Sequence, residues 1–149
     1  MELICFVPLN KHLSRLNSDV LDDLKSVDNV DIYKTFENFS ERLSRPKKLD
    51  TIIIIIAESR QDFEKLISYK DFLNNTRNIM VLPDREKETL DLALLFFPRF
   101  YIFADQDFKQ IGEVVRKCTK NLQREKTIRT KKSINGKCKK INKANKNTT

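Results

Sequence analysis

Acidic side chains lie just beyond two of the most apolar stretches of the sequence, and they are the residues best suited to chemistry. Glu58 follows the isoleucine run at 52–56, and Asp105 and Asp107 follow FYIFA with the spacing DxD. Carboxylates are preferred ligands of Mg²⁺, which supports phosphohydrolase or nuclease chemistry. The structural alternative is that an aspartate before a helix caps its free N–H groups. We expect capping by Asp105 or Asp107 and no metal, and we keep a Mg²⁺-dependent enzyme that uses all three acids as an alternative.

Few other residues combine into catalytic machinery. His12 is the only histidine and has no recognisable serine, cysteine or aspartate partner, so we interpret it as a surface or half-buried residue. The three cysteines, Cys5, Cys118 and Cys138, are widely spaced, which argues against a zinc site and favours a reducing compartment. Only two glycines occur, so glycine-rich phosphate loops and a nucleophile elbow are excluded. We therefore expect no cofactor and assign no catalytic residue.

Apolar stretches of strand length alternate with segments of helical periodicity. The strand candidates are residues 3–7, 30–36, 52–56, 78–82 and 99–104. Such alternation is typical of an α/β fold in which helices cover both faces of a parallel sheet. The isoleucine run is apolar on both faces and should be the central strand, whereas 30–36 alternates apolar and polar residues as an edge strand does. The sequence therefore predicts five strand–helix units in order.

The fourth helix and the fifth strand concentrate phenylalanines within LLFFPRFYIF, residues 94–103. The predicted inner stripe of the helix is formed by Leu90, Ala93, Leu94 and Phe97, and Pro98 should end it. Phe96 is out of phase with this stripe, so we predict that it is exposed. The alternative is that Phe96 packs at the edge of the core.

This order of elements resembles the response-regulator receiver domain over residues 2–122. The resemblance implies a doubly wound, five-stranded parallel sheet of order 2-1-3-4-5 in a flavodoxin-like three-layer sandwich. In receivers, two acids after the first strand hold Mg²⁺, an aspartate at the end of the third accepts the phosphoryl group, a threonine or serine ends the fourth, and a lysine ends the fifth. Receivers also dock partners and dimerise through the fourth and fifth helices and the fifth strand, which here suggests an interface at Phe96, Arg99 and Tyr101.

The receiver positions are neutral in this sequence. They fall on Pro8, Leu9, Ile55, Ala57, Leu82, Pro83 and Ala104. Phosphoryl transfer requires a carboxylate nucleophile, a divalent cation held by acids, and a positive charge for the transition state. The resemblance therefore implies a pseudo-receiver of two-component signalling or a phosphorelay. We expect it to be non-catalytic, not phosphorylated on aspartate, and to bind a signalling protein or a second copy of itself.

Charge divides the chain into two parts. The net charge is +8, but residues 116–149 contain thirteen lysines and arginines and one glutamate, a net of +12, which leaves residues 1–115 at −4. We predict a folded domain at 1–122 followed by a basic, disordered tail at 123–149. Dense positive charge attracts nucleic acid or another anionic surface, although this tail has no aromatic residue for base stacking. Tail-mediated nucleic-acid binding is therefore a third functional alternative.

The apolar segments also bear on location. The N-terminal MELICFVPLN lacks the basic residues and the length of a signal peptide. The isoleucine run is far shorter than the ~20 residues that a membrane span requires. We therefore expect a soluble, cytoplasmic protein.

Overall fold

The computed structural model describes residues 1–24, 27–122 and 124, and the chain divides into two compact units. The first unit comprises Met1–Arg116 and the second Lys117–Thr149. In the second unit, residues 117–122 and 124 are helical. The predicted tail at 123–149, including Cys138, lies outside the described residues apart from Arg124, so its predicted disorder and its binding to nucleic acid stay predictions.

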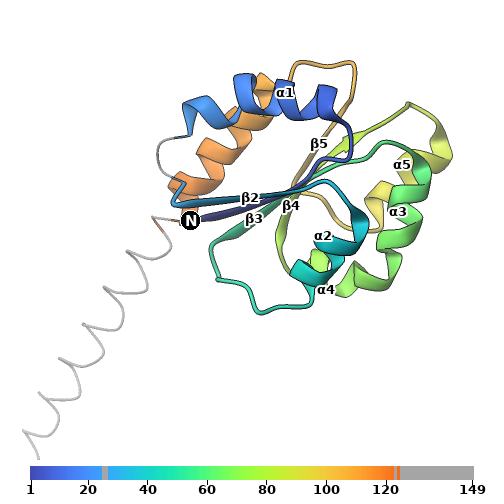
Figure 1. Cartoon of the computed structure of the whole chain (residues 1–149), viewed down its shortest axis with the longest axis horizontal. Helices are drawn as coiled ribbons and strands as arrows, with labels where there is room; N and C mark the ends of the chain where they lie inside the picture. The colour runs from blue at the N-terminus through green and yellow to red at the C-terminus, as the bar shows by residue number, and fades with distance from the viewer. Residues whose placement is uncertain (25–26, 123, 125–149) are drawn as a thin grey trace, which may run out of the picture. The chain divides into compact units, whose positions relative to one another are not determined.

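A five-stranded parallel sheet forms the centre of the first unit (Figure 1). The strands are β1 (Glu2–Phe6), β2 (Asn29–Tyr33), β3 (Thr51–Ile56), β4 (Arg77–Leu82) and β5 (Phe100–Phe103). Their spatial order is β2-β1-β3-β4-β5. This order confirms the predicted doubly wound, flavodoxin-like α/β fold.

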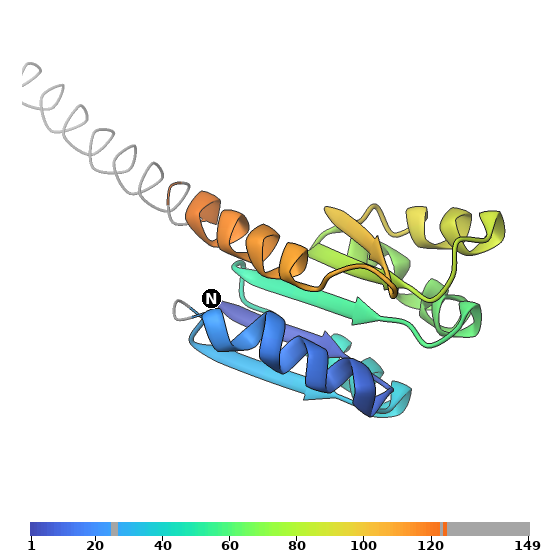
Figure 2. The ribbon, with the colours of Figure 1, turned by 90° about the horizontal axis from the view of Figure 1, so that it is seen from above.

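Burial along the strands follows from their place in the sheet. Every residue of β1 and β3 is buried, and the five isoleucines of β3 are fully buried because helices cover both faces of the central strands. Strand β2 is half-exposed, as an edge strand with one wetter face should be. Figure 2 shows β1, β2 and β3 running side by side in the same direction.

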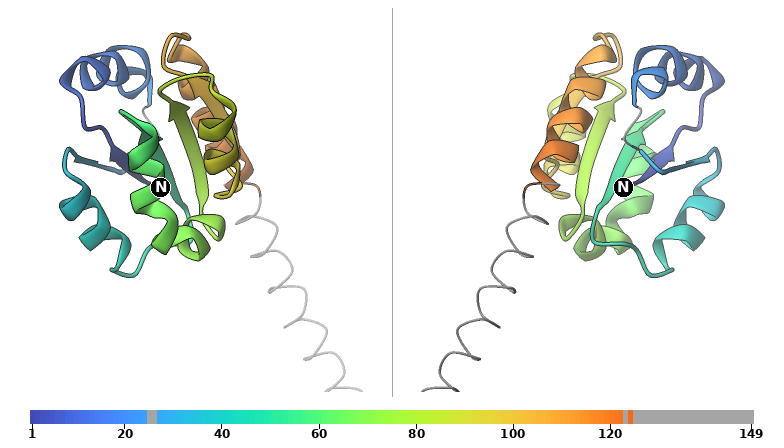
Figure 3. Two further views of the ribbon diagram at one scale, coloured as in Figure 1. Left: turned by 90° about the vertical axis from the view of Figure 1, so that its right-hand side faces the viewer. Right: turned by 90° about the vertical axis from the view of Figure 1, so that its left-hand side faces the viewer.

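Helices lie on both sides of this sheet. Figures 1 and 3 show α1 (Asn10–Asp19) on one side, and α2 (Phe36–Leu43), α3 (Arg60–Leu66) and α5 (Lys87–Leu94) on the other. The remaining elements of this unit are the 3-10 turns η1 (Leu21–Asp23) and η2 (Ile67–Tyr69), the short α4 (Lys70–Asn74), and a helix that begins at residue 109. Within the described residues, no helix has the length and apolar composition that a membrane crossing requires.

The α2–α5 side of the sheet holds a continuous apolar core. It combines alternate residues of the strands, such as Ile53 and Ile55, with buried side chains of the helices, such as Phe39 and Phe63. Alternate strand residues point to opposite faces of a sheet, so the neighbouring Ile52 and Ile54 pack on the α1 side. The run of isoleucines therefore supplies core to both layers.

The end of α5 differs from the sequence prediction. Phe96 is fully buried and its ring centroid lies 6.3 Å from that of Phe63, so the prediction that Phe96 is exposed was wrong. Phe97, which was assigned to the inner stripe, is 72% exposed, and Leu94 is 44% exposed. The physical reason is that the buried stripe of α5 is Thr89, Ala93 and Phe96, at spacing i, i+4, i+7, which differs in phase from the predicted stripe. Phe97 lies past the end of α5 at Leu94 and adopts a left-handed conformation with φ 47°. Helical phase cannot be extrapolated past that reversal of the backbone.

Candidate functional site

A pocket lies at the carboxyl edge of the sheet, where receivers carry their active site, and its lining combines neutral residues at the receiver positions with four charged ones. The pocket has a volume of about 350 Å³ and is lined by Leu9, Lys11, His12, Arg15, Ala57, Glu58, Pro83, Ala104 and Asp105. Four of the seven degenerate receiver positions are among them, because the carboxyl ends of parallel strands meet at one edge. Pro8 is half-buried, whereas Ile55 and Leu82 are fully buried in β3 and β4.

Arg15 is committed to the backbone at this edge. Its two terminal nitrogens donate to the carbonyl oxygens of Ala104 and Gln106, each at 2.6 Å. Its guanidinium carbon lies 3.7 Å from the ring centroid of Phe108. Arg15 therefore anchors the turn after β5 to α1, and its guanidinium group is already bound to two backbone carbonyl oxygens.

His12 is buried in the same pocket. Its ring stacks on Phe108 at 5.9 Å, and its Nδ1 has no hydrogen-bond partner. Burial, followed by the charges of Lys11 and Arg15, lowers the pKa of His12 below its usual value. Our interpretation of His12 as a surface or half-buried residue was wrong, because the sequence does not reveal that Phe108 covers it.

Glu58 and Asp105 of the alternative enzyme line the same pocket, but Asp105 and Asp107 are engaged with other groups. Asp105 forms an ion pair with Arg85 at 3.0 Å. Asp107 accepts a hydrogen bond from the backbone N–H of Lys109 at 3.0 Å, which is the predicted capping role. Glu58 is exposed, and among residues 1–24, 27–122 and 124 no three metal-binding side chains form a group. The structure therefore does not bring Glu58, Asp105 and Asp107 together as a metal site.

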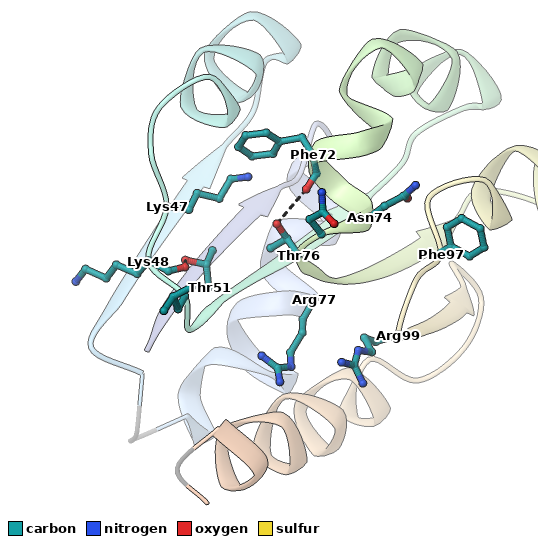
Figure 4. A pocket seen from close by; sticks show the side chains of 11 residues that line it. Lys47, Lys48, Thr51, Phe72, Asn74, Thr76, Arg77, Phe97 and Arg99 are labelled. Atoms are coloured by element: carbon teal, nitrogen blue, oxygen red, sulfur yellow. Dashed lines mark hydrogen bonds between the residues drawn. The ribbon is translucent and has the colours of Figure 1, made fainter. Parts of the chain in front are cut away.

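A larger pocket lies at the opposite, amino edge of the sheet (Figure 4). It has a volume of about 520 Å³ and is lined by Lys47, Lys48, Leu49, Thr51, Phe72, Asn74, Asn75, Thr76, Arg77, Phe97 and Arg99. These residues come from the approach to β3, from α4 and the start of β4, and from the loop before β5. The lining contains four cationic side chains and no acid.

An ion pair beneath this pocket supports the loop that enters β3. Arg42 of α2 and Glu2 of β1 are both buried, and their side chains meet at 2.5 Å. The Thr51 hydroxyl lies 3.1 Å from a Glu2 carboxylate oxygen and 2.8 Å from the carbonyl oxygen of Lys48. The loop that carries Lys47 and Lys48 is thereby tied to the sheet at both ends.

Asn78 supports the other side of the pocket. This residue of β4 is fully buried, and its Nδ2 donates to the carbonyl oxygens of Leu73 at 3.0 Å and Phe96 at 3.1 Å. The backbone N–H of Arg99 donates to the carbonyl oxygen of Asn78 at 2.9 Å. One buried amide therefore fixes the end of α4 to the turn that presents Phe97.

Lys47 has an unusual environment in the pocket wall. Its Nζ is buried without a hydrogen-bond partner and lies 2.9 Å from the ring centroid of Phe72. Burial, followed by the charge of Arg42, lowers the Lys47 pKa to about 8, and Glu2 opposes this shift. Figure 4 shows the Lys47 side chain extending toward the Phe72 ring.

Sequence reasoning missed this amino-edge pocket, although it singled out one of its residues. Arg99 lies there, whereas Tyr101, its proposed interface partner, is exposed on β5 beside Phe103. The available signal was a basic residue shortly before three strands, in RPKKLD, TRN and PRF. Ligands of this fold bind at the carboxyl edge of the sheet, so the fold class gave no reason to expect a site at the amino edge.

No family model matches the chain, and no curated protein matches it significantly. The resemblance to receivers therefore depends on the order of elements and the topology of the sheet. Topology of this kind is shared by proteins with many functions.

Proposed function

We propose that this protein is a non-catalytic, receiver-like regulatory domain that acts by binding a protein partner and is not phosphorylated on an aspartate. The observation that carries the proposal is the neutral carboxyl edge of the sheet. Ala57 follows β3 where a receiver has its acceptor aspartate, and Pro83 and Ala104 follow the next two strands.

Two charged groups near this edge, Arg15 and Asp105, support the proposal because they have other roles. Phosphoryl transfer needs a carboxylate that is free to attack and a cation free to stabilise the transferred group. Arg15 donates to two carbonyl oxygens, and Asp105 pairs with Arg85. A domain of this kind would act in a two-component or phosphorelay circuit through contact alone.

Exposed apolar side chains near the fifth strand supply a contact surface. Leu94 and Leu95 are exposed at the end of α5, and Tyr101 is exposed on β5. Strand β5 is an edge of the described sheet, and an edge strand offers unpaired backbone groups to another strand. A second copy of this chain presents the same edge, so we take self-association as the binding event to test.

The first test combines a phosphodonor with a measurement of mass. The full chain is incubated with acetyl phosphate and Mg²⁺, and its intact mass and its oligomeric state by light scattering are recorded. We expect no phosphoryl adduct and the same self-association with and without the phosphodonor. A receiver that has its acceptor aspartate serves as the positive control.

Two outcomes would contradict the proposal. A hydroxylamine-sensitive adduct of one phosphoryl group would show that an aspartate accepts phosphate after all. A change of oligomeric state on adding acetyl phosphate would show regulation by phosphorylation in place of constitutive binding.

A further inference from the structure

We propose that the amino-edge pocket binds a nucleotide, with its phosphate held by the lysines and arginines of the lining and its base stacked on an exposed phenylalanine. This inference does not depend on the proposed regulatory function. It concerns the opposite edge of the sheet and a different ligand.

Charge is the first observation in its favour. Residues 1–115 carry a net charge of −4, yet the pocket gathers Lys47, Lys48, Arg77 and Arg99 with no acid in its lining. Lys47, Lys48 and Arg99 form no ion pair with any residue that the structure describes. Like charges concentrated in a concave site repel each other and raise the local concentration of anions. A phosphate is the group that such a site complements.

The topology of the sheet explains how these cations meet. Lys47 and Lys48 precede β3, Arg77 begins β4, and Arg99 immediately precedes β5. Adjacent strands of a sheet lie about 4.8 Å apart, so residues at the starts of three neighbouring strands share one rim. Figure 4 shows that these side chains come from different elements, with Lys47 extending toward Phe72 and Lys48 extending away from the two arginines.

Phe97 is the second, independent observation. Its ring lines the pocket yet remains 72% exposed, so burial contributes little to holding it in place. Its backbone adopts φ 47°, a left-handed conformation that costs a non-glycine residue about 1–2 kcal/mol. Strained residues that persist in a fold are concentrated at ligand sites. An exposed ring beside cations is the arrangement on which nucleic-acid bases stack.

Lys47 and Phe72 provide the third observation. The Nζ of Lys47 is an orphaned, buried donor in the wall of the pocket, and the Phe72 ring beside it is part-exposed. A cation–π contact is weaker than a charge-assisted hydrogen bond to an anion. A phosphate oxygen in the pocket would give this ammonium its missing partner.

The volume of the amino-edge pocket is compatible with a bound nucleotide. Pockets for small ligands and cofactors usually enclose about 300–1,000 Å³. The amino-edge pocket has a volume of about 520 Å³. A free nucleotide and one nucleotide of a single strand carry the same chemistry, and the experiment below separates these two sources.

The experiment measures how pocket variants of the full chain bind a labelled ten-nucleotide oligo(dT) by fluorescence anisotropy at fixed salt. Phe97→Asn removes the ring and retains a residue that tolerates the left-handed conformation. Lys48→Gln removes one exposed cation of the lining. The matched controls are Ile67→Asn and Lys109→Gln, which remove an exposed apolar side chain and an exposed cation outside the pocket.

We expect Phe97→Asn to weaken binding about 5- to 150-fold, because stacking of one base contributes roughly 1–3 kcal/mol. Lys48→Gln should reduce the slope of log K against log salt concentration by about one, since one phosphate contact is lost. Both controls should bind as the parent does. Because the basic C-terminal segment attracts nucleic acid by itself, the decisive quantity is the difference between pocket and control variants.

Competition identifies the source of the nucleotide. Displacement of the probe by thymidine monophosphate, and much less by inorganic phosphate, assigns the pocket to free nucleotides. Displacement by an unlabelled oligonucleotide alone assigns it to single strands. Equal displacement by inorganic phosphate would show that the ring plays no part, and unchanged affinity of both pocket variants would show that the tail alone binds; either result overturns the proposal.

Discussion

The chemistry of the amino-edge pocket depends on individual side chains, and Lys47 is the one whose charge is most readily tested. Its ammonium is buried against Phe72, and the groups that face it are the cation of Arg42 and the carboxylate of Glu2. These surroundings lower its pKa to about 8. The lysine is therefore charged below that pH and loses its proton as the pH rises through it.

The pH dependence of binding follows from this ionisation. We expect oligonucleotide affinity to fall as the pH rises from 7 to 9, because the cation is lost while the phosphodiester keeps its charge. Lys47→Arg should remove this dependence, since a guanidinium stays protonated throughout the range. Anisotropy titrations at several pH values measure it, and a parent affinity that is flat across pH 8 would contradict the role given to Lys47.

Burial also disfavours the charged form of a residue outside the pocket. Cys5 is completely buried in β1, and burial followed by the charge of Asp31 raises the pKa of its thiol to about 12. Cys5 is therefore a small core residue with a protonated thiol. His12 illustrates the limit of the sequence, because the Phe108 ring that covers it lies far along the chain.

At the scale of elements, the most accurate predictions were local ones. The isoleucine run forms the central strand as predicted, and a Ser59–Asp62 capping box, whose spacing can be read in the sequence, begins α3. These features depend on residues a few positions apart, so sequence spacing determines them. The prediction for Phe96 failed because the helix buries the stripe of Thr89, Ala93 and Phe96, and two stripes of similar apolar content were available in this sequence.

The contribution of the turn after α5 to stability can be tested at Asn78, whose side chain donates to the carbonyl oxygen of Phe96. Asn78→Ala removes the Asn78 donor from the buried carbonyl oxygen of Phe96, whereas the carbonyl oxygen of Leu73 keeps its bond from the backbone N–H of Thr76, so the free energy of unfolding should fall by about 1–3 kcal/mol. The midpoint of thermal unfolding should fall by roughly 5–15 °C. Because the turn that presents Phe97 is released, oligonucleotide binding should weaken as well.

The control for Asn78 is another asparagine that donates to a backbone carbonyl. Asn75→Ala removes an exposed bond from Nδ2 to the carbonyl oxygen of Asp71, and we expect a change within about 0.5 kcal/mol. Urea denaturation of both variants measures the difference. Equal stability losses in the two variants would show that burial of the Asn78 amide contributes nothing.

At the scale of the whole domain, substitutions on the two outer strands of the sheet, β5 and β2, should have different effects on self-association. Tyr101 on β5 is 38% exposed and Val30 on β2 is 36% exposed, so they are similar apolar surfaces on opposite edges. If copies of the chain associate through β5, Tyr101→Lys should give a monomer, whereas Val30→Lys should leave the association intact. A charge buried without a partner at an interface is strongly unfavourable.

Light scattering after size exclusion, at high micromolar concentration, measures this difference. Loss of the dimer in Val30→Lys but not in Tyr101→Lys would place the interface at the other edge. A parent chain that is monomeric at every concentration would contradict self-association altogether.

The sequence by itself determined the elements and the class of fold. Strand and helix periods, caps and prolines act over a few residues, and alternation of strands with helices leaves few ways to cover a parallel sheet. It also determined that neutral residues follow the strands at the receiver positions, because that requires only knowing where each strand ends.

Only the tertiary structure decided which side chains meet. Lys47, Phe72, Phe97 and Arg99 are separated by up to about a third of the chain, and they share one pocket because the amino ends of β3, β4 and β5 lie side by side. The packing of Phe96 on Phe63 and the hydrogen bond from Asn78 to the carbonyl oxygen of Phe96 likewise join distant residues. Contacts of this kind join residues that are distant along the chain, and no periodicity within a single element records them.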